Sequence, residues 1–391
     1  MKTKLIHLVL LASLCSANAW AQTPTPPAGM PTPAPPQLGA SSYVLMDYHS
    51  GALLVEHEAD ARVEPASITK LMTSYVVFQE LTSGNIALED PVPISEKAWR
   101  AIGSRMFLEP SMQVTVEDLV KGVVIQSGND ASVALAEFLA GTEDAFANVM
   151  NFYAEQLGMR NTHFVNATGL PDENHYTTAR DIALMSIALI RDFPDYYRWY
   201  AEKEFTFNNI RQHNRNNLLW RDPAVDGLKT GHTEAAGYCL AASAKREGMR
   251  LISVVMGSFS EQSRASESQS LLNYGFRFFE TVQLYEAGQE LATGRVWKGE
   301  ADEVSMGLAE DLFITIPRGR YDDLEARLEV QPELKAPLDA GQAVGRIRIE
   351  LDGKDVTGRD LVTTQAVEPA GFFGRAMDGM RLWIGGLFGD E

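Results

Sequence analysis

The sequence predicts an α+β protein in which an antiparallel sheet flanked by helices is followed by a small all-β domain and an amphipathic C-terminal helix. Three observations lead to this fold class. Strand patterns stand at both ends of a long body, residues 39–282, and helical patterns fill its middle. Short runs of alternating apolar and charged residues dominate residues 283–368. Apolar residues then recur at helical spacing in residues 369–391.

The N-terminus has the pattern of a secretory signal peptide. Lys2 and Lys4 form a basic start, and the apolar run Leu5–Leu14 follows. The A-x-A pattern Ala19–Ala21 then provides a cleavage site. The apolar run is too short to cross a bilayer core of about 30 Å. Residues 1–21 are therefore expected to be removed, and the mature protein to be exported.

Residues 22–38 and the body that follows differ sharply in composition. Residues 22–38 are rich in Pro and Thr, which favours an extended spacer with no core of its own. In the body, a helix beginning at Pro65 carries apolar residues at helical spacing. Strands are predicted for Tyr43–Asp47, Leu53–Val55, Tyr238–Ser243 and Leu251–Gly257. Strands at both ends with helices between them favour one antiparallel sheet with helices packed on it.

The C-terminal part divides into two segments. Residues 283–368 alternate with a period of two, which indicates a β-rich domain with one face in water. Examples are Leu312–Ile316, then Ala326, Leu328 and Val330, and then Ile347, Ile349 and Leu351. In residues 369–391, one helical stripe holds Phe373, Ala376, Met377, Met380, Trp383, Ile384, Leu387 and Phe388. Such a helix is suited to a membrane surface, and the alternative is docking on the β-rich domain.

Charge and cysteine content limit the possible functions. The chain has 52 acidic and 34 basic residues and a net charge of −18, which argues against nucleic-acid binding. Without the signal peptide only Cys239 remains, so no internal disulfide is expected. Its apolar surroundings favour a buried small side chain over a nucleophile. The cluster Asp172, Glu173 and His175 is interpreted as a solvated loop, and no metal or other cofactor is expected.

Three short motifs in the body carry the chemistry. They are S-x-x-K at Ser67–Lys70, S-x-N at Ser127–Asn129 and K-T-G at Lys229–Gly231. By composition, a K-T-G triplet is expected in only about one chain of this length in ten. All three motifs in this order, on compatible local structure, form a specific signal for acyl transfer to a serine.

The first motif places a nucleophile beside a base. Ser67 is predicted in the first turn of the helix that follows Pro65, where unpaired N–H groups favour negative charge. Lys70 lies three positions on and shares that helix face, so its amine reaches the hydroxyl. A serine becomes a good nucleophile when a neighbouring base takes its proton. Burial and the positive charge of Lys229 are expected to lower the pKa of Lys70 for this task.

The other two motifs are predicted to surround that serine. Ser127 is placed to relay a proton toward the leaving amine, and Asn129 to hold Lys70 or the substrate amide. The K-T-G run just precedes the strand at 238–243, and an edge strand there would pair with an extended peptide. Lys229 and Thr230 would face the terminal carboxylate of that peptide. The backbone N–H groups of Ser67 and His232 are the candidates for the oxyanion hole.

The sequence around the motifs resembles that of one protein family. Low-molecular-mass penicillin-binding proteins, the serine-type D-alanyl-D-alanine carboxypeptidases, are similar over essentially the whole mature chain apart from the spacer. The matching segments are Pro65–Lys70, Ser127–Ala131, Thr168–Pro171, Thr177–Asp181 and Val225–Thr233. The resemblance implies a catalytic domain of the penicillin-binding-protein/β-lactamase-like transpeptidase type over residues 39–282. It also implies removal of the terminal D-alanine from peptidoglycan stem peptides, with β-lactams as covalent inhibitors.

Further expectations come from the same resemblance. Arg264 would help to bind the substrate carboxylate, Arg215 would line the site, and Gly231 and His232 would contribute to substrate binding. Residues 369–391 would attach the exported enzyme to the periplasmic face of the cytoplasmic membrane as a peripheral protein.

Three alternatives remain at this point. A serine β-lactamase of class A uses a Glu to activate water, and no Glu followed by Leu-Asn lies between Ser127 and Lys229. A D,D-endopeptidase shares the motifs but usually lacks the C-terminal domain. A peptidoglycan-binding protein with vestigial activity is opposed by the intact motif residues.

Overall fold

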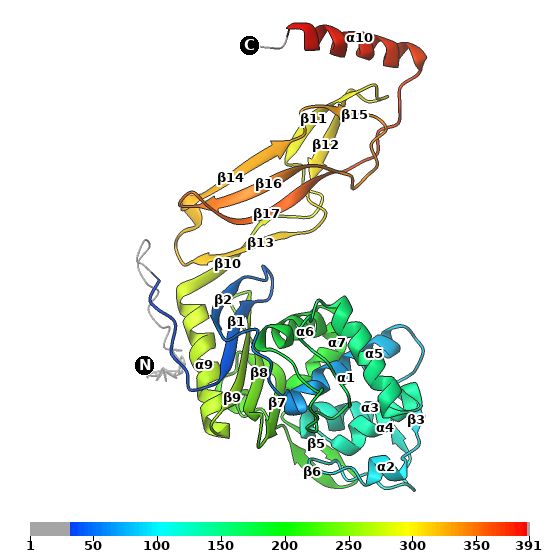
Figure 1. The fold of residues 1–391 in the computed structure, drawn as a ribbon, viewed down its shortest axis with the longest axis vertical. Coiled ribbons are helices and arrows are strands. Elements are labelled where there is room, and N and C mark those ends of the chain that lie inside the picture. The colour runs from blue at the N-terminus through cyan, green and yellow to red at the C-terminus, as the bar shows by residue number, and fades with distance from the viewer. Residues whose placement is uncertain (1–31, 389–391) are drawn as a thin grey trace, which may run out of the picture.

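Five antiparallel strands form the central sheet of the larger domain (Figure 1). Their order is β2-β1-β9-β8-β7, so the first strands of the domain pair with the last ones. The bounds are β1 Ser42–Asp47, β2 Leu53–His57, β7 Val225–Thr233, β8 Gly237–Arg246 and β9 Met249–Ser258. The predicted fold class is confirmed. The structure, a computed structural model, describes residues 32–388, and the predicted signal peptide lies outside these residues.

The K-T-G motif precedes β8, as predicted, and lies on a strand for which the sequence had given no bounds. Lys229–Gly231 are part of β7, which pairs with β8 from Val225 to Thr233. Since β7 is the edge of the sheet, one side of its backbone is left without a partner strand.

Both faces of this sheet are buried, because side chains alternate along its strands. Leu45 and Leu251 point toward helix α9, Glu261–Phe278. Val44 and Val254 point to the other face, which is covered by α1 and α6. The remaining helices gather on that second face, away from α9 (Figure 1). The fold is therefore a sheet between one long helix and a helical cluster.

The other elements of the domain are short. The helices are α1 Lys70–Thr82, α2 Glu96–Trp99, α3 Val116–Lys121, α4 Asn129–Ala140, α5 Glu143–Gln156, α6 Ala179–Asp192, α7 Pro194–Tyr197 and α8 Leu218–Arg221. Two hairpins pair β3 Pro91–Val92 with β4 Val114–Thr115, and β5 Glu204–Phe207 with β6 Ile210–His213. Side chains cap several helix N-termini: Thr142 caps α5, Thr178 caps α6, and Ser260 forms a capping box on α9.

The second domain is built from strands, as predicted. A two-stranded sheet pairs β10 Phe279–Tyr285 with β13 Leu312–Pro317. A six-stranded sheet has the order β14-β16-β17-β12-β11-β15. Its bounds are β11 Ala292–Trp297, β12 Glu303–Gly307, β14 Leu324–Val330, β15 Leu334–Lys335, β16 Ala343–Leu351 and β17 Lys354–Thr363.

The alternation in this domain has two outcomes. On β16, Ile347 and Ile349 are buried in a core cluster, as an alternating strand with one dry face requires. On β14, the same pattern does not produce a buried face, and Leu328 remains 43% exposed. β14 is an edge strand of the sheet.

A partly buried polar junction joins the two domains. The Asp47 carboxylate accepts hydrogen bonds from the Ser50 hydroxyl (2.9 Å) and the Thr281 hydroxyl (2.6 Å). Thr315 of β13 closes the network with a 2.6 Å contact to Ser50 and a 2.9 Å contact to Thr281. The ring of His49 stacks on Phe313 at 4.7 Å between centroids. The turn between β1 and β2 is thus fastened to the second domain by side chains, in addition to the chain connection.

Helix α10, Phe372–Phe388, lies across the far end of the second domain (Figure 1). Its contact there is polar: the Lys298 N–H donates to the Asp378 carboxylate at 2.8 Å. Apolar side chains of its described part are exposed, among them Phe373 at 85%. Among residues 32–388, no helix is long and apolar enough to span a membrane.

Candidate active site

Ser67 lies in a tight turn immediately before α1. The turn, Ala66–Thr69, is a 3-10 turn, and the α-helix begins only at Lys70. The sequence predicted Ser67 within the first turn of the α-helix itself. The difference arises at Ala66, whose φ of 46° is incompatible with a right-handed helix. Such a backbone conformation is costly for a residue other than glycine and is typical of functional sites. Ser67 faces a cleft of about 210 Å³.

Lys70 is fully buried behind Ser67. Its Nζ donates hydrogen bonds to Ser67 Oγ at 2.9 Å, to Asn129 Oδ1 at 2.7 Å and to the Thr168 carbonyl at 2.6 Å. Burial lowers the pKa of Lys70 to about 7, and the charges of Asp130 and Glu143 partly oppose this. The charge of Lys229, which the sequence suggested would also lower the pKa of Lys70, is not one of the causes of this shift. Burial alone therefore makes the amine available as a base near neutral pH.

Ser127 and Asn129 approach from the opposite side of the cleft. Ser127 follows a π-helical turn, Gly122–Gln126, and has a φ of 67°. Its side chain lines the cleft with Ser67. Asn129 begins α4 and donates from Nδ2 to the Ile102 carbonyl at 2.6 Å while its Oδ1 accepts from Lys70. One amide thus fixes the lysine and the neighbouring loop together.

The K-T-G residues form the wall made by β7. Thr230, Gly231 and His232 line the cleft, and the Lys229 side chain is buried behind them. Lys229 Nζ donates to the Thr230 carbonyl at 3.1 Å. The pKa of Lys229 is lowered well below its usual value by burial, and further by the charges of Lys70, Arg264 and Arg215.

Two arginines complete this wall. Arg264 of α9 is buried and donates from Nη1 to the Gly231 carbonyl at 3.1 Å. Arg215 lies in the loop after β6 and also lines the cleft. The structure thus brings together every site residue that the sequence singled out. They are Ser67, Lys70, Ser127, Asn129, Arg215, Lys229, Thr230, Gly231, His232 and Arg264.

Four residues of the site were not predicted from the sequence. Ser104, Tyr238 and Glu261 line the cleft, and Thr168 supplies a carbonyl to Lys70. Tyr238 pairs with His232 across β7 and β8, and their rings stack at 4.0 Å. A hairpin register would have predicted this pair, and helical spacing would have placed Glu261 beside Arg264. No local pattern marks Ser104, whose loop reaches the site through tertiary contacts.

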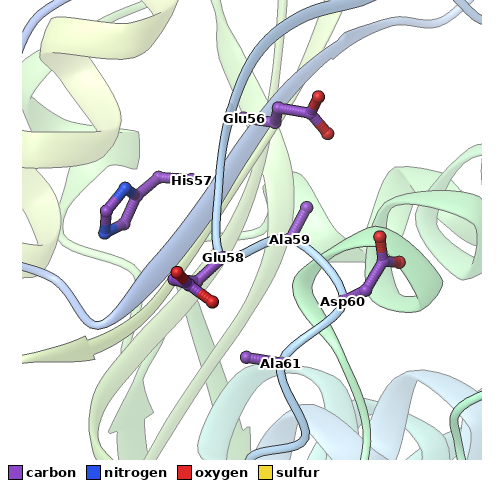
Figure 2. A pocket seen from close by; sticks show the side chains of 6 residues that line it. All are labelled: Glu56, His57, Glu58, Ala59, Asp60 and Ala61. Atoms are coloured by element: carbon purple, nitrogen blue, oxygen red, sulfur yellow. The ribbon is translucent and has the colours of Figure 1, made fainter.

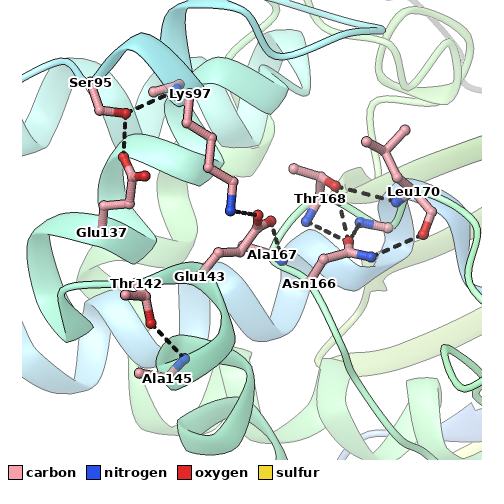
Figure 3. A network of polar contacts seen from close by, with 12 residues as sticks. Ser95, Lys97, Glu137, Thr142, Glu143, Ala145, Asn166, Ala167, Thr168 and Leu170 are labelled. Carbon is pink, nitrogen blue, oxygen red and sulfur yellow. Dashed lines mark hydrogen bonds and ion pairs between the residues drawn. The ribbon is translucent and has the colours of Figure 1, made fainter.

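The loop that supplies the Thr168 carbonyl is held by its own side chains (Figure 3). Asn166 Oδ1 accepts from the N–H groups of Thr168 at 3.1 Å and Gly169 at 2.7 Å. Gly169 has a φ of 83°, and a Cβ there would lie 1.8 Å from the Ala66 carbonyl oxygen. Only glycine fits this approach, which presses the loop against the turn that carries Ser67.

Glu143 ties the same loop to the helical cluster. Its carboxylate accepts from the Ala167 N–H at 3.1 Å and pairs with Lys97 Nζ at 2.8 Å (Figure 3). Glu143 also raises the pKa of Lys70 through its charge. It therefore acts on the lysine in two ways, through the position of the loop and through electrostatics.

Glu143→Gln is expected to shift the pH profile of acylation toward acid. Losing the negative charge lowers the pKa of Lys70 further, so its neutral form is reached at lower pH. The weakened contact to Ala167 should also lower the free energy of unfolding by about 1–3 kcal/mol. Penicillin acylation rates between pH 5 and 9 test the shift. Asp144→Asn, the exposed neighbour on α5, is the matched control. An unmoved profile in Glu143→Gln would contradict the electrostatic role.

His175 is not the solvated residue that the sequence indicated. Its ring is buried, Nε2 lies 2.8 Å from Thr69 Oγ1, and Nδ1 accepts from the Val165 N–H at 3.1 Å. Burial lowers the pKa of His175 to about 4, so the ring is neutral near pH 7. Accepting at Nδ1 leaves Nε2 as the donor to Thr69. The imidazole thus links the loop to the turn that carries Ser67.

A second, larger hollow of about 620 Å³ lies beside β2 (Figure 2). It is lined by residues 56–61, and Figure 2 shows His57 on one side of the strand, with Glu56 and Asp60 on the other. Both of these carboxylates are paired with Arg180, at 2.8 Å each. The hollow lacks a nucleophile–base pair, so the smaller cleft is the candidate active site.

Comparisons with known proteins agree with this site. The family model described as D-alanyl-D-alanine carboxypeptidase matches residues 30–260, and a model of the penicillin-binding protein 5 C-terminal domain matches residues 279–369. The chain is 50% identical to D-alanyl-D-alanine carboxypeptidase DacA of Escherichia coli (strain K12), over 91% of both chains.

Two solved structures are similar in fold. Penicillin-binding protein 5 from Haemophilus influenzae has a TM-score of 0.83 and 48% identity, and the match covers 86% of this chain and 99% of that one. Penicillin-binding protein D2 from Listeria monocytogenes, in an ampicillin-bound form, has a TM-score of 0.57 and 29% identity. That match covers 61% of this chain and 98% of the other.

Proposed function

Because the chain belongs to the D-alanyl-D-alanine carboxypeptidase family, we propose that it releases the terminal D-alanine of peptidoglycan pentapeptide stems through an acyl-enzyme on Ser67. The chain is a serine-type D-alanyl-D-alanine carboxypeptidase and a penicillin-binding protein. The observation that carries the proposed residue assignment is the 2.9 Å contact between Lys70 Nζ and Ser67 Oγ, with a lysine pKa of about 7.

Acylation begins with proton transfer from Ser67 to Lys70. In its neutral form the amine accepts the hydroxyl proton while Oγ attacks the carbonyl carbon of the penultimate D-alanine. Ser127, which lines the same cleft, relays a proton to the leaving amine of the last D-alanine. The backbone N–H groups of Ser67 and His232 stabilise the oxyanion. Water then hydrolyses the ester and regenerates Ser67.

Substrate orientation rests on β7. Its free edge pairs with the extended end of the stem peptide by strand addition. Thr230, Arg264 and Arg215 receive the terminal carboxylate, and the buried Lys229 lies behind them. Asn129, whose amide is bonded to both Lys70 and the Ile102 carbonyl, keeps Lys70 in place. A β-lactam carries an equivalent carboxylate and a reactive carbonyl, so it acylates the same serine.

Mass spectrometry of the purified protein tests this assignment. After penicillin, a stable adduct is expected on Ser67, and a diacetyl-Lys-D-Ala-D-Ala peptide is expected to lose one D-alanine. Rapid penicillin hydrolysis with no adduct and no peptide cleavage would favour a β-lactamase. Cleavage restricted to cross-linked peptides would favour an endopeptidase, and inertness toward all three would favour a peptidoglycan-binding protein.

We also propose that the exported protein is peripherally attached to the periplasmic face of the cytoplasmic membrane through residues 369–391. The exposed apolar side chains Phe373, Met377 and Met380 support this over docking on the second domain. The contact of α10 with that domain uses Asp378, which leaves the apolar side chains free. The net charge of −18 makes attachment depend on apolar insertion and not on attraction to anionic lipid.

Removing residues 370–391 is expected to abolish sedimentation with phosphatidylethanolamine–phosphatidylglycerol vesicles. Apolar insertion is worth about 25 cal/mol per Å² of apolar surface, and the truncated protein lacks this surface. Both proteins should form the penicillin adduct equally, which controls for folding. High salt should leave vesicle binding of the full chain intact. Equal sedimentation of the two proteins would refute attachment through this helix.

A further inference from the structure

Glu261 lies in the active-site cleft next to the arginine assigned to the substrate carboxylate. It is the first residue of α9 and lines the cleft with Arg264. Its Oε1 is 3.6 Å from Arg264 Nη2, one helical turn away. No sequence motif or step of the proposed reaction uses this residue.

The contacts of the Arg264 guanidinium leave only its Nη2 side facing the cleft. Its side chain is 6% exposed, Nη1 is bonded to the Gly231 carbonyl, and the Tyr238 ring centroid lies 5.5 Å from Cζ. Nη2 is directed toward Glu261, whose own side chain is 61% exposed. The exposed carboxylate therefore covers the part of a buried guanidinium that faces the cleft.

The charges in the cleft make this arrangement notable. The lining side chains include Arg215 and Arg264 as cations, and Glu261 is the one acidic residue among those that line the described cleft. A second carboxylate that approaches Arg264 meets the like charge of Glu261. Because Glu261 is long and exposed, it can move aside, whereas Arg264 is held by Gly231.

We propose that Glu261 is a specificity-determining residue whose carboxylate competes with the terminal carboxylate of the substrate for Arg264. This inference rests on the proposed role of Arg264. In the free enzyme Glu261 supplies the counter-charge to the buried arginine. When substrate or β-lactam binds, its carboxylate replaces Glu261, and when D-alanine leaves, Glu261 returns. The residue thus weakens the binding of anionic ligands and aids the release of product.

Glu261→Gln tests the competition directly. KM for diacetyl-Lys-D-Ala-D-Ala is expected to fall about two- to five-fold, the range of an exposed ion pair. The second-order rate of penicillin acylation should rise by a similar factor, and kcat should not rise. Salt screens exposed charges, so the difference from the parent protein should shrink at high ionic strength. An unchanged or higher KM would overturn the proposal.

Glu234→Gln is the matched control. Glu234 is exposed in the turn between β7 and β8, a few residues from Gly231, and does not line the cleft. This substitution removes one negative charge near the site. Because Glu234 does not line the cleft, KM should stay unchanged. An equal fall of KM in both variants would mean that the overall field acts, and would also overturn the proposal.

Arg264→Gln separates this inference from the proposed function. Alone it should raise KM about ten-fold or more, because a charge-assisted contact to the carboxylate is lost. In the Arg264→Gln background, adding Glu261→Gln should have no effect on KM. If Arg264→Gln leaves KM unchanged, the carboxylate role of Arg264 fails. If it raises KM while Glu261→Gln alone changes nothing, only the competition fails. Stoichiometric penicillin adducts establish that each variant is folded.

Discussion

Ser67→Ala is expected to abolish both release of D-alanine and formation of the penicillin adduct. The variant removes the atom that forms the acyl-enzyme, and loss of a serine nucleophile in a comparable hydrolase costs about 10⁶-fold in kcat. The hydroxyl accepts one of three hydrogen bonds from Lys70, so the buried lysine keeps two partners and the fold should persist. Chromatography of released D-alanine and mass spectrometry after penicillin measure the two losses.

Ser104→Ala is the control for this experiment. Ser104 also presents a side chain to the cleft but has no base beside it among the described contacts. Its substitution should leave the penicillin adduct in place. A penicillin adduct on Ser67→Ala would contradict the assignment of the nucleophile. Survival of the cellular role in a strain that carries only Ser67→Ala would show that binding, and not hydrolysis, is what the cell uses.

Lys70→Gln is expected to slow penicillin acylation by about 10²- to 10⁴-fold, the usual contribution of a positioned general base. Glutamine can still donate to Asn129 Oδ1 and the Thr168 carbonyl but cannot take a proton from Ser67. The loss should therefore appear in the acylation rate and far less in the melting temperature. Lys121→Gln, in the last turn of α3 where the lysine pairs with Glu117, controls for loss of a lysine away from the cleft. Acylation at the parent rate would exclude Lys70 as the base.

The pH dependence of acylation follows from the same lysine. Burial lowers its pKa to about 7, so its neutral fraction increases as the pH rises through 7. The logarithm of the acylation rate should rise with a slope near one below pH 7 and level off above it. Stopped-flow measurements on the parent protein test this, and Lys70→Gln should lack the rise. A rise centred near pH 10 would mean that the lysine has its ordinary pKa.

Much of the site could be predicted because its chemistry is local in sequence. Ser67 and Lys70 are three residues apart, so their spacing places these two side chains together. Lys229 to His232 lie on one strand, so they are also close to one another. Arg264 and Arg215 have no such spacing and were reached only through the resemblance to a family. The fold class followed from the strand patterns at both ends of the first domain, which pair in the sheet as β1 and β9.

What the sequence did not reveal depends on contacts between distant segments. The carbonyl of Thr168 reaches Lys70 across 98 positions, and the His175 ring reaches Thr69 across 106. No periodic pattern encodes such contacts, and His175 looked like part of a polar loop. The start of α1 was misplaced because Ala66 has a positive φ, and its carbonyl lies against Gly169 of a loop distant in sequence.

The partly buried junction of Asp47, Ser50, Thr281 and Thr315 has a mechanical consequence. Helix α10 lies at one end of the described molecule, and β7, which forms a wall of the catalytic cleft, lies in the first domain, with the strands of the second domain between them (Figure 1). Because hydrogen bonds from residues of both domains meet at this junction, the second domain acts as a stalk, that is, a spacer with a fixed orientation, and not as a flexible linker. With the tail on a bilayer, the stalk sets the height at which the cleft works. Under the proposed attachment, stem peptides at that height in the wall would be within reach, and those much nearer the membrane or farther from it would not.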